Sequence, residues 1–176
     1  MKDLIDDVEN RHALIGVNFE RGTEIDDILR KVAENLRAKG LSVAGLLQLR
    51  GDGSSDCDCR MMCLEDLSTG IKHPISESRG PEAQGCHLDR QALVVLAQQV
   101  EQNLSGDTDI LIINRFGQAE SEGRGFRGAI EKALTLGVQV IIAYRAEYLR
   151  EWQEFEGGLA TQAVAEVDRI LSLMAG

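Results

Sequence analysis

The sequence predicts an α/β domain with a mainly parallel sheet and helices on both faces of that sheet. Short apolar runs alternate with amphipathic stretches along the chain, which is typical of repeated βαβ units. Residues 109–113 are continuously apolar, as expected of a central parallel strand that is buried on both faces. The chain has 176 residues, of which 43% are hydrophobic, and this is enough for one domain with its own core. We therefore expect a single domain over residues 1–176.

Each expected element has a local signal. A first strand at 12–18 leads to a helix at 24–39, for which Thr23 is the expected N-cap and Gly40 the stop. Asp89 is expected near the start of a later helix, where a carboxylate suits the helix dipole. The remaining expected strands are 41–49, 109–113 and 138–143, and the remaining helices are 126–136, 147–155 and 159–174.

The pattern breaks at about residues 50–85. This segment contains a glycine- and serine-rich run, three cysteines and turn-like residues at 66–70. Short strands around 61–65 and 71–75 are expected to pair as a hairpin. We interpret the segment as an insertion in the α/β domain rather than a second domain.

The charge balance excludes some classes of partner. The chain has 19 Lys and Arg against 29 Asp and Glu, a net charge of −10, whereas nucleic-acid binders usually present a basic face. No apolar run approaches the roughly 20 residues of a membrane helix, and the acidic start lacks a signal region. We expect a cytoplasmic protein that binds neither nucleic acid nor membrane. The sequence is compatible with either a monomer or a homo-oligomer.

One segment stands out at the edge of the sheet where ligands usually bind. In open α/β sheets this is the edge at the carboxyl ends of the strands, which gathers residues 19–23, Gln48 onward, 114–127 and 144–145. Glycines and arginines in 114–127 favour oxyanions through backbone N–H groups and guanidinium forks. The alternative is a surface loop whose arginines pair with its glutamates. The candidate ligand residues are Asn114, Arg115, Gly117, Glu120, Gly123, Arg124 and Gly125.

A second candidate segment is 75–81. Arg79 with its neighbouring serines offers anion contacts, and Gly80 with Pro81 fixes a turn. The alternative is that these residues simply end a hairpin.

The four cysteines give a weak metal signal. Their spacing is C-x-C-x₃-C, not the C-x₂-C of zinc sites. In a cytoplasmic protein they are expected to be reduced thiols, either redox-active or partly buried, with a reactive thiol in an insertion that projects from the sheet. The candidate metal ligands are Cys57, Cys59, Cys63, Cys86 and His87.

Nucleotide-binding fingerprints are incomplete. Residues 16–23 lie where a P-loop would, but no Lys precedes Thr23, and Glu20 would repel a phosphate. A G-x-G-x-x-G match at 123–128 lies ten residues after its strand rather than directly at a strand–helix junction.

Residues 76–81, 85–89 and above all 114–125 resemble an uncharacterised bacterial family of degenerate P-loop nucleoside-triphosphatase-like proteins, often found with molybdate-transport genes. The resemblance covers about residues 13–162. It implies a P-loop NTPase-like three-layer sandwich with a small hairpin and a Cys-containing insertion, together with a link to molybdate handling. Active P-loop relatives have an Asp-Glu pair where this chain has Asn114 and Arg115.

The leading hypothesis is a protein that binds a small oxyanion, such as molybdate or tungstate, and is not a competent NTPase. Arg79, Arg115, Arg124 and backbone N–H groups would hold the anion. One alternative is an enzyme that binds or hydrolyses a nucleotide with Mg²⁺, in which Glu120 or Glu122 orients water. Another is an interaction module that uses its thiols.

Overall fold

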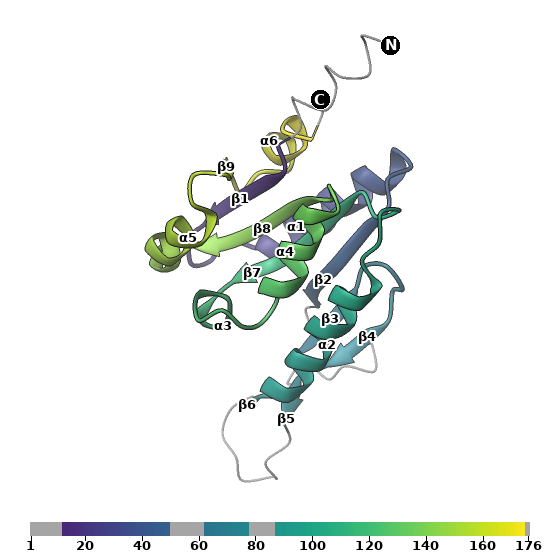
Figure 1. Ribbon diagram of the computed structural model, residues 1–176, viewed down its shortest axis with the longest axis vertical. Coiled ribbons are helices and arrows are strands. Elements are labelled where there is room, and N and C mark those ends of the chain that lie inside the picture. The colour runs from purple at the N-terminus through teal and green to yellow at the C-terminus, as the bar shows by residue number, and fades with distance from the viewer. Residues whose placement is uncertain (1–11, 50–61, 78–86, 175–176) are drawn as a thin grey trace.

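The computed structural model describes residues 12–49, 62–77 and 87–174. Its main sheet has the strand order β4-β3-β2-β7-β8-β1-β9 (Figure 1). The parallel part comprises β1 (Leu14–Phe19), β2 (Val43–Leu49), β7 (Ile110–Phe116), β8 (Gln139–Arg145) and β9 (Thr161–Val164). The antiparallel strands β3 (Cys63–Asp66) and β4 (Lys72–Pro74) extend it beyond β2. Strands β5 (Ser76–Glu77) and β6 (His87–Leu88) form a separate pair.

Helices cover both faces of this sheet, so the molecule has three layers. Helices α2 (Arg90–Asn103), α4 (Arg127–Thr135) and α5 (Leu149–Glu156) pack on one face. Helices α1 (Ile25–Ala38) and α6 (Val167–Ser172) pack on the other. Two short helices, α3 (Gln118–Ser121) and η1 (Ala146–Tyr148), follow β7 and β8. The expected fold class is confirmed.

The centre of the sheet follows from its apolar strands. Ile110 and Ile112 pack toward α1, while Leu111 and Ile113 pack toward α2 and α4, and all four are at most 1% exposed. A strand buried on both faces needs apolar residues at every position, since successive side chains point to opposite faces. The expected central strand at 109–113 is therefore confirmed, although it begins one residue later, at Ile110, and continues to Phe116.

The helix starts agree only partly with expectation. Asp89 caps α2, because its carboxylate accepts hydrogen bonds from the backbone N–H groups of Gln91 and Ala92, each at 3.0 Å. Helix α1 instead has Glu24 at its N-cap position, without a side-chain capping bond. The expected Thr23 cap is wrong, because the helix begins one residue later than the sequence pattern indicates.

The expected hairpin is present as β3 and β4, with Leu64 opposite His73. Its described part continues the sheet and does not project from it. Cys63 is 1% exposed and disulfide-bonded, so the expectation of reduced thiols is wrong for this residue. The other three cysteines lie outside the described residues.

The expected helix at 159–174 is wrong in its first half. Gly157 and Gly158 adopt positive φ angles of 57° and 85° after α5, which ends that helix and redirects the chain. Residues of β9 then pair in parallel with β1, with Thr161 opposite Ile15. Its β-branched residues suit a strand, and only 167–172 form the helix α6.

Among the residues that the structure describes, no helix has both the length and the apolar character needed to span a bilayer.

Candidate ligand pocket

A cavity of about 230 Å³ lies at the carboxyl edge of the sheet. We call it the edge pocket. Three of the four segments that the sequence placed at this edge contribute to it: the β1–α1 connection, the end of β2 and the end of β7. They meet because β1, β2 and β7 run parallel, so that their carboxyl ends face the same side. The pocket is lined by Gly22, Thr23, Glu24, Ile25, Asp26, Gln48, Leu49 and Arg115.

Asp26, in the first turn of α1, joins these segments. One carboxylate oxygen, Oδ1, accepts hydrogen bonds from the backbone N–H of Gln48 at 3.0 Å and from Nδ2 of Asn114 at 3.2 Å. The other, Oδ2, receives Nη2 of Arg115 at 3.3 Å. The side chain of Asp26 is 16% exposed and that of Arg115 is 41% exposed. The carboxylate is therefore partly buried and holds the ends of β2 and β7 against α1.

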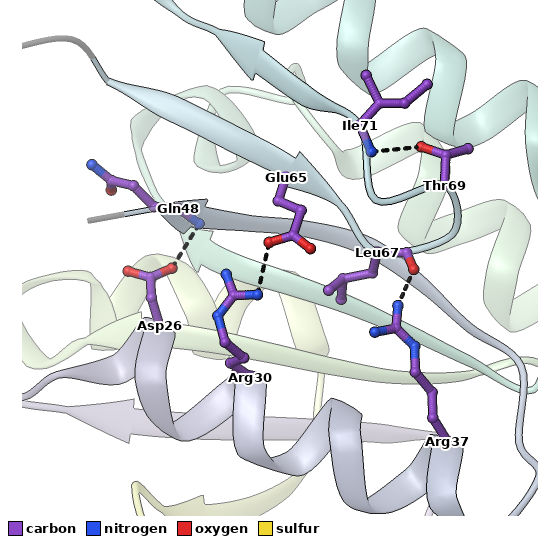
Figure 2. A network of polar contacts seen from close by, with 8 residues as sticks. All are labelled: Asp26, Arg30, Arg37, Gln48, Glu65, Leu67, Thr69 and Ile71. Atoms are coloured by element: carbon purple, nitrogen blue, oxygen red, sulfur yellow. Dashed lines mark hydrogen bonds and ion pairs between the residues drawn. The ribbon is translucent and has the colours of Figure 1, made fainter. Parts of the chain in front are cut away.

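A row of polar residues continues along α1 beyond the edge pocket. Figure 2 shows Asp26, Arg30 and Arg37 directed toward β2, β3 and the turn after β3. Nη1 of Arg30 forms an ion pair with Oε2 of Glu65 at 2.7 Å. Arg37 donates to the backbone carbonyl of Leu67. These contacts attach β3 and the turn after it to α1.

Residues 117–126, which we call the α3 loop, satisfy their own polar groups. The carboxylate of Glu120, a residue only 6% exposed, accepts from the backbone N–H groups of Gly117 at 3.0 Å and Phe126 at 3.1 Å. Arg124 pairs with Glu122. The side-chain hydrogen bond from Arg124, followed by that from Gln118, lowers the pKa of Glu122. For Arg124 the structure thus agrees with the alternative interpretation, in which an arginine of this surface loop pairs with one of its glutamates.

The fourth segment of the edge lies at the end of β8 and is outside the lining of the edge pocket. Tyr144 is buried, donates its hydroxyl to Oε1 of Gln162 at 2.7 Å, and has a pKa raised mainly by that burial. The guanidinium of Arg145 lies 6.0 Å from the ring centroid of Phe19 and contacts Glu147 at 3.4 Å. The polar groups of Tyr144 and Arg145 are thus engaged with neighbouring side chains of the protein.

The structure brings only part of the expected ligand set to this cavity. Arg115 lines it, and Asn114 contacts its Asp26. The other five candidates of that segment belong to the α3 loop and do not line the cavity. Their roles in binding stay predictions. The five are Gly117, Glu120, Gly123, Arg124 and Gly125.

Other expected site residues are only partly described. Arg79 and Gly80, like Cys57, Cys59 and Cys86, lie outside the described residues, and of His87 only the backbone in β6 is described. Cys63 does not present a free thiolate, because it is in a disulfide. In the described part of the chain no group of three or more His, Cys, Asp or Glu residues could hold a metal ion.

Asp26 lines the edge pocket but is not among the residues predicted from the sequence. Its sequence context is inconspicuous, because acidic residues are common in the first turn of a helix, where they suit the helix dipole. The usable signal is the spacing of Asp26, Arg30 and Arg37, which places three charged side chains along one side of the buried stripe of α1.

The family is shown by sequence comparison. A model of the family described as "Protein of unknown function (DUF2478)" matches residues 14–172. The chain belongs to this family. It is also 29% identical over 143 residues, 81% of its length, to the "Molybdenum import ATP-binding protein ModC 2" of Bradyrhizobium diazoefficiens. It spans only 16% of that longer protein.

Two solved structures share the fold of this DUF2478 chain. A human cancer-related nucleoside triphosphatase matches with a TM-score of 0.58 and 16% identity, over 86% of this chain and 87% of that one. THEP1 from the hyperthermophile Aquifex aeolicus matches with a TM-score of 0.60 and 15% identity, over 93% of this chain and 99% of that one. The expected likeness to P-loop nucleoside triphosphatases is therefore confirmed for the fold.

Proposed function

We propose that this chain binds a nucleotide in the edge pocket. The observation that carries the proposal is the position of this cavity, at the junction of β1 and α1 and at the carboxyl ends of β2 and β7. Open α/β sheets bind their ligands at this edge. The fold is shared with a nucleoside triphosphatase, and part of the sequence is similar to an ATP-binding protein. Both comparisons favour a nucleotide over the small oxyanion that the sequence placed first.

The lining offers the groups that a nucleotide needs. The half-exposed guanidinium of Arg115 can bind a phosphate oxygen, and the hydroxyl of Thr23 and the amide of Gln48 can hydrogen-bond to phosphate, sugar or base. A volume of about 230 Å³ is below the roughly 300 Å³ of the smaller drug-sized sites. The pocket would therefore enclose one part of the nucleotide and leave the rest across the edge of the sheet.

The same residues support binding without efficient hydrolysis. The β1–α1 connection has no lysine to reach the phosphates, and β7 carries Asn114 and Arg115 near its end. Glu24 and Asp26 bring negative charge to the lining. Mg²⁺ that accompanies the nucleotide would offset this charge.

The proposal is tested by isothermal titration of the full chain with ATP, ADP, GTP and GDP, each with Mg²⁺, and with molybdate and phosphate. Binding of at least one nucleotide is expected. Arg115→Gln should weaken it about ten- to a hundredfold, as for a lost bond to a charged group. Arg124→Gln is the matched control, because it removes a guanidinium from the same segment but outside the pocket.

Two results would contradict the proposal. One is that no nucleotide binds while molybdate or phosphate does, which would restore the oxyanion hypothesis. The other is that Arg124→Gln weakens nucleotide binding while Arg115→Gln leaves it unchanged, which would move the site to the α3 loop.

A further inference from the structure

We infer that the carboxylate of Asp26 is an internal anion of the edge pocket, which competes with a phosphate group of the ligand for Arg115. The inference rests on the proposed function and deepens it, since it names the residue that sets how strongly the pocket accepts a free anion. Asp26 would thus determine specificity through Arg115.

The first observation is the set of donors around Asp26. A backbone N–H from β2, a side-chain amide from β7 and a guanidinium from β7 all point at one carboxylate, at 3.0, 3.2 and 3.3 Å. Backbone N–H groups, amides and guanidinium groups are the usual donors to phosphate oxygens. In this structure a side chain of the protein itself occupies the anion position among them.

The second observation is that the contact of Arg115 is separate from the other two, since it alone is made to Oδ2 of Asp26. Strong charge-assisted N–H···O bonds measure about 2.7–2.9 Å, and the contact between Arg115 and Asp26 is longer, at 3.3 Å. Arg115 is also the more exposed partner, at 41% against 16%. The carboxylate therefore stays fixed by Gln48 and Asn114, while the guanidinium can exchange it for a ligand.

The pairing of Asp26 with Arg115 affects which ligands the edge pocket accepts. A compact anion that depends mainly on Arg115 must draw this guanidinium away from Asp26 and then lie close to the negative charge of the carboxylate, which Coulomb repulsion opposes. A nucleotide has additional contacts through its sugar and base and carries Mg²⁺, so it can offset this cost. The wild-type pocket should therefore discriminate against free phosphate and molybdate.

The test is titration of Asp26→Asn and wild type with MgATP and with inorganic phosphate at fixed salt. The carboxamide that Asp26→Asn introduces can still accept from the N–H of Gln48 but no longer holds Arg115 by charge. Inorganic phosphate should bind about ten- to a hundredfold more tightly to Asp26→Asn than to wild type, and MgATP should gain less, because its other contacts already offset the cost. The double variant Asp26→Asn/Arg115→Gln should lose that gain, which a merely structural role of Asp26 would not produce.

Asp27→Asn is the matched control. Asp27 is the next residue in the same helical turn, is exposed and does not line the pocket. It removes the same charge and should leave both affinities unchanged. Thermal unfolding of each variant checks that the fold is retained. A second substitution, Asp26→Ala, should also increase the affinity for inorganic phosphate.

The outcomes separate the inference from the proposed function. If wild type binds MgATP and Asp26→Asn gains no affinity for inorganic phosphate, the inference fails and the nucleotide site stands. An equal gain in affinity in Asp27→Asn would mean that the effect comes from the change in net charge of the protein, and this too would overturn the inference. If neither wild type nor Asp26→Asn binds any nucleotide, both ideas fail.

Discussion

The edge pocket and the α3 loop lie near each other along β7 and its continuation, yet they use their charged groups in different ways. In the α3 loop, Glu120 binds two backbone N–H groups and Arg124 pairs with Glu122, so the charges serve the loop itself. In the edge pocket, Asp26 and Arg115 pair across two segments and still line a cavity. The segment richest in glycine and arginine is thus internally satisfied, and the cavity forms from less conspicuous residues.

The glycines of the α3 loop have a local explanation. Gly123 and Gly125 adopt φ angles of 81° and 64°, a region that other residues enter only with strain. A Cβ atom at Gly125 would lie 2.2 Å from Oε1 of Glu120. The backbone therefore needs glycine in order to bring the N–H of Phe126 to the buried carboxylate, and this requirement explains the motif without a ligand.

The largest expected effect in this comparison is that of Glu120→Ala. The change leaves the partly buried N–H of Gly117 and the buried N–H of Phe126 without their acceptor, at about 1–3 kcal/mol for an unsatisfied buried donor. We expect the free energy of unfolding to fall by about 2–5 kcal/mol. Urea unfolding measures it, with titration of MgATP alongside, in which the affinity of the folded variant should be unchanged.

Glu122→Ala is the control for Glu120→Ala, because it removes a carboxylate from the same loop that is exposed and paired only with exposed groups. Its free energy of unfolding should differ from that of wild type only slightly, far less than that of Glu120→Ala. A loss of nucleotide affinity in Glu120→Ala, with its fold intact, would show that the α3 loop and the edge pocket are not separate in function.

The sequence predicted the layers well because buried strands and amphipathic helices have strong periodic signals. The central strand at 109–113 and the stripe of Ile25, Leu29 and Leu36 in α1 are examples. The edge strand β9 was not predicted, because it has only four residues and follows closely on two glycines. So short a segment has too little hydrophobic periodicity to distinguish a strand from a helix. Pairing with β1, a long-range contact, decides its structure.

The candidate site was predictable only at the level of the sheet edge. The rule for parallel sheets placed residues 19–23, Gln48 and Arg115 together, and the pocket contains members of all three. It could not separate Arg115 from Arg124, since both are arginines in one glycine-rich segment. Their partners differ, and a partner such as Asp26, 89 positions away, is not visible in the local sequence.

A medium effect is expected from one glycine in each region. Gly125→Ala adds a Cβ that displaces the Glu120 carboxylate and also forces a positive φ, which should cost about 2–3 kcal/mol. Gly22→Ala, in the edge pocket, has a φ of 93° but meets no atom within 4 Å, so about 1–2 kcal/mol of strain is expected. Chemical denaturation compares the two. Equal losses would mean that the α3 loop does not depend on Glu120 in the way described.

The smallest expected effect is the dependence of stability on pH through Glu122. The hydrogen bonds from Arg124 and then Gln118 lower its pKa from the ordinary value of 4.5. A carboxyl whose pKa is lower in the folded state stabilises the fold above its unfolded pKa, and loses this contribution as the pH falls through the folded value. The melting temperature of wild type should therefore exceed that of Glu122→Gln slightly at neutral pH, and the two should converge in acid. Because both partners of this ion pair are exposed to solvent, high salt should also remove the difference. If the difference in melting temperature persists in acid or in high salt, Glu122 contributes by packing and not by charge. The charges of the α3 loop would then not be the purely local arrangement that distinguishes this loop from the edge pocket.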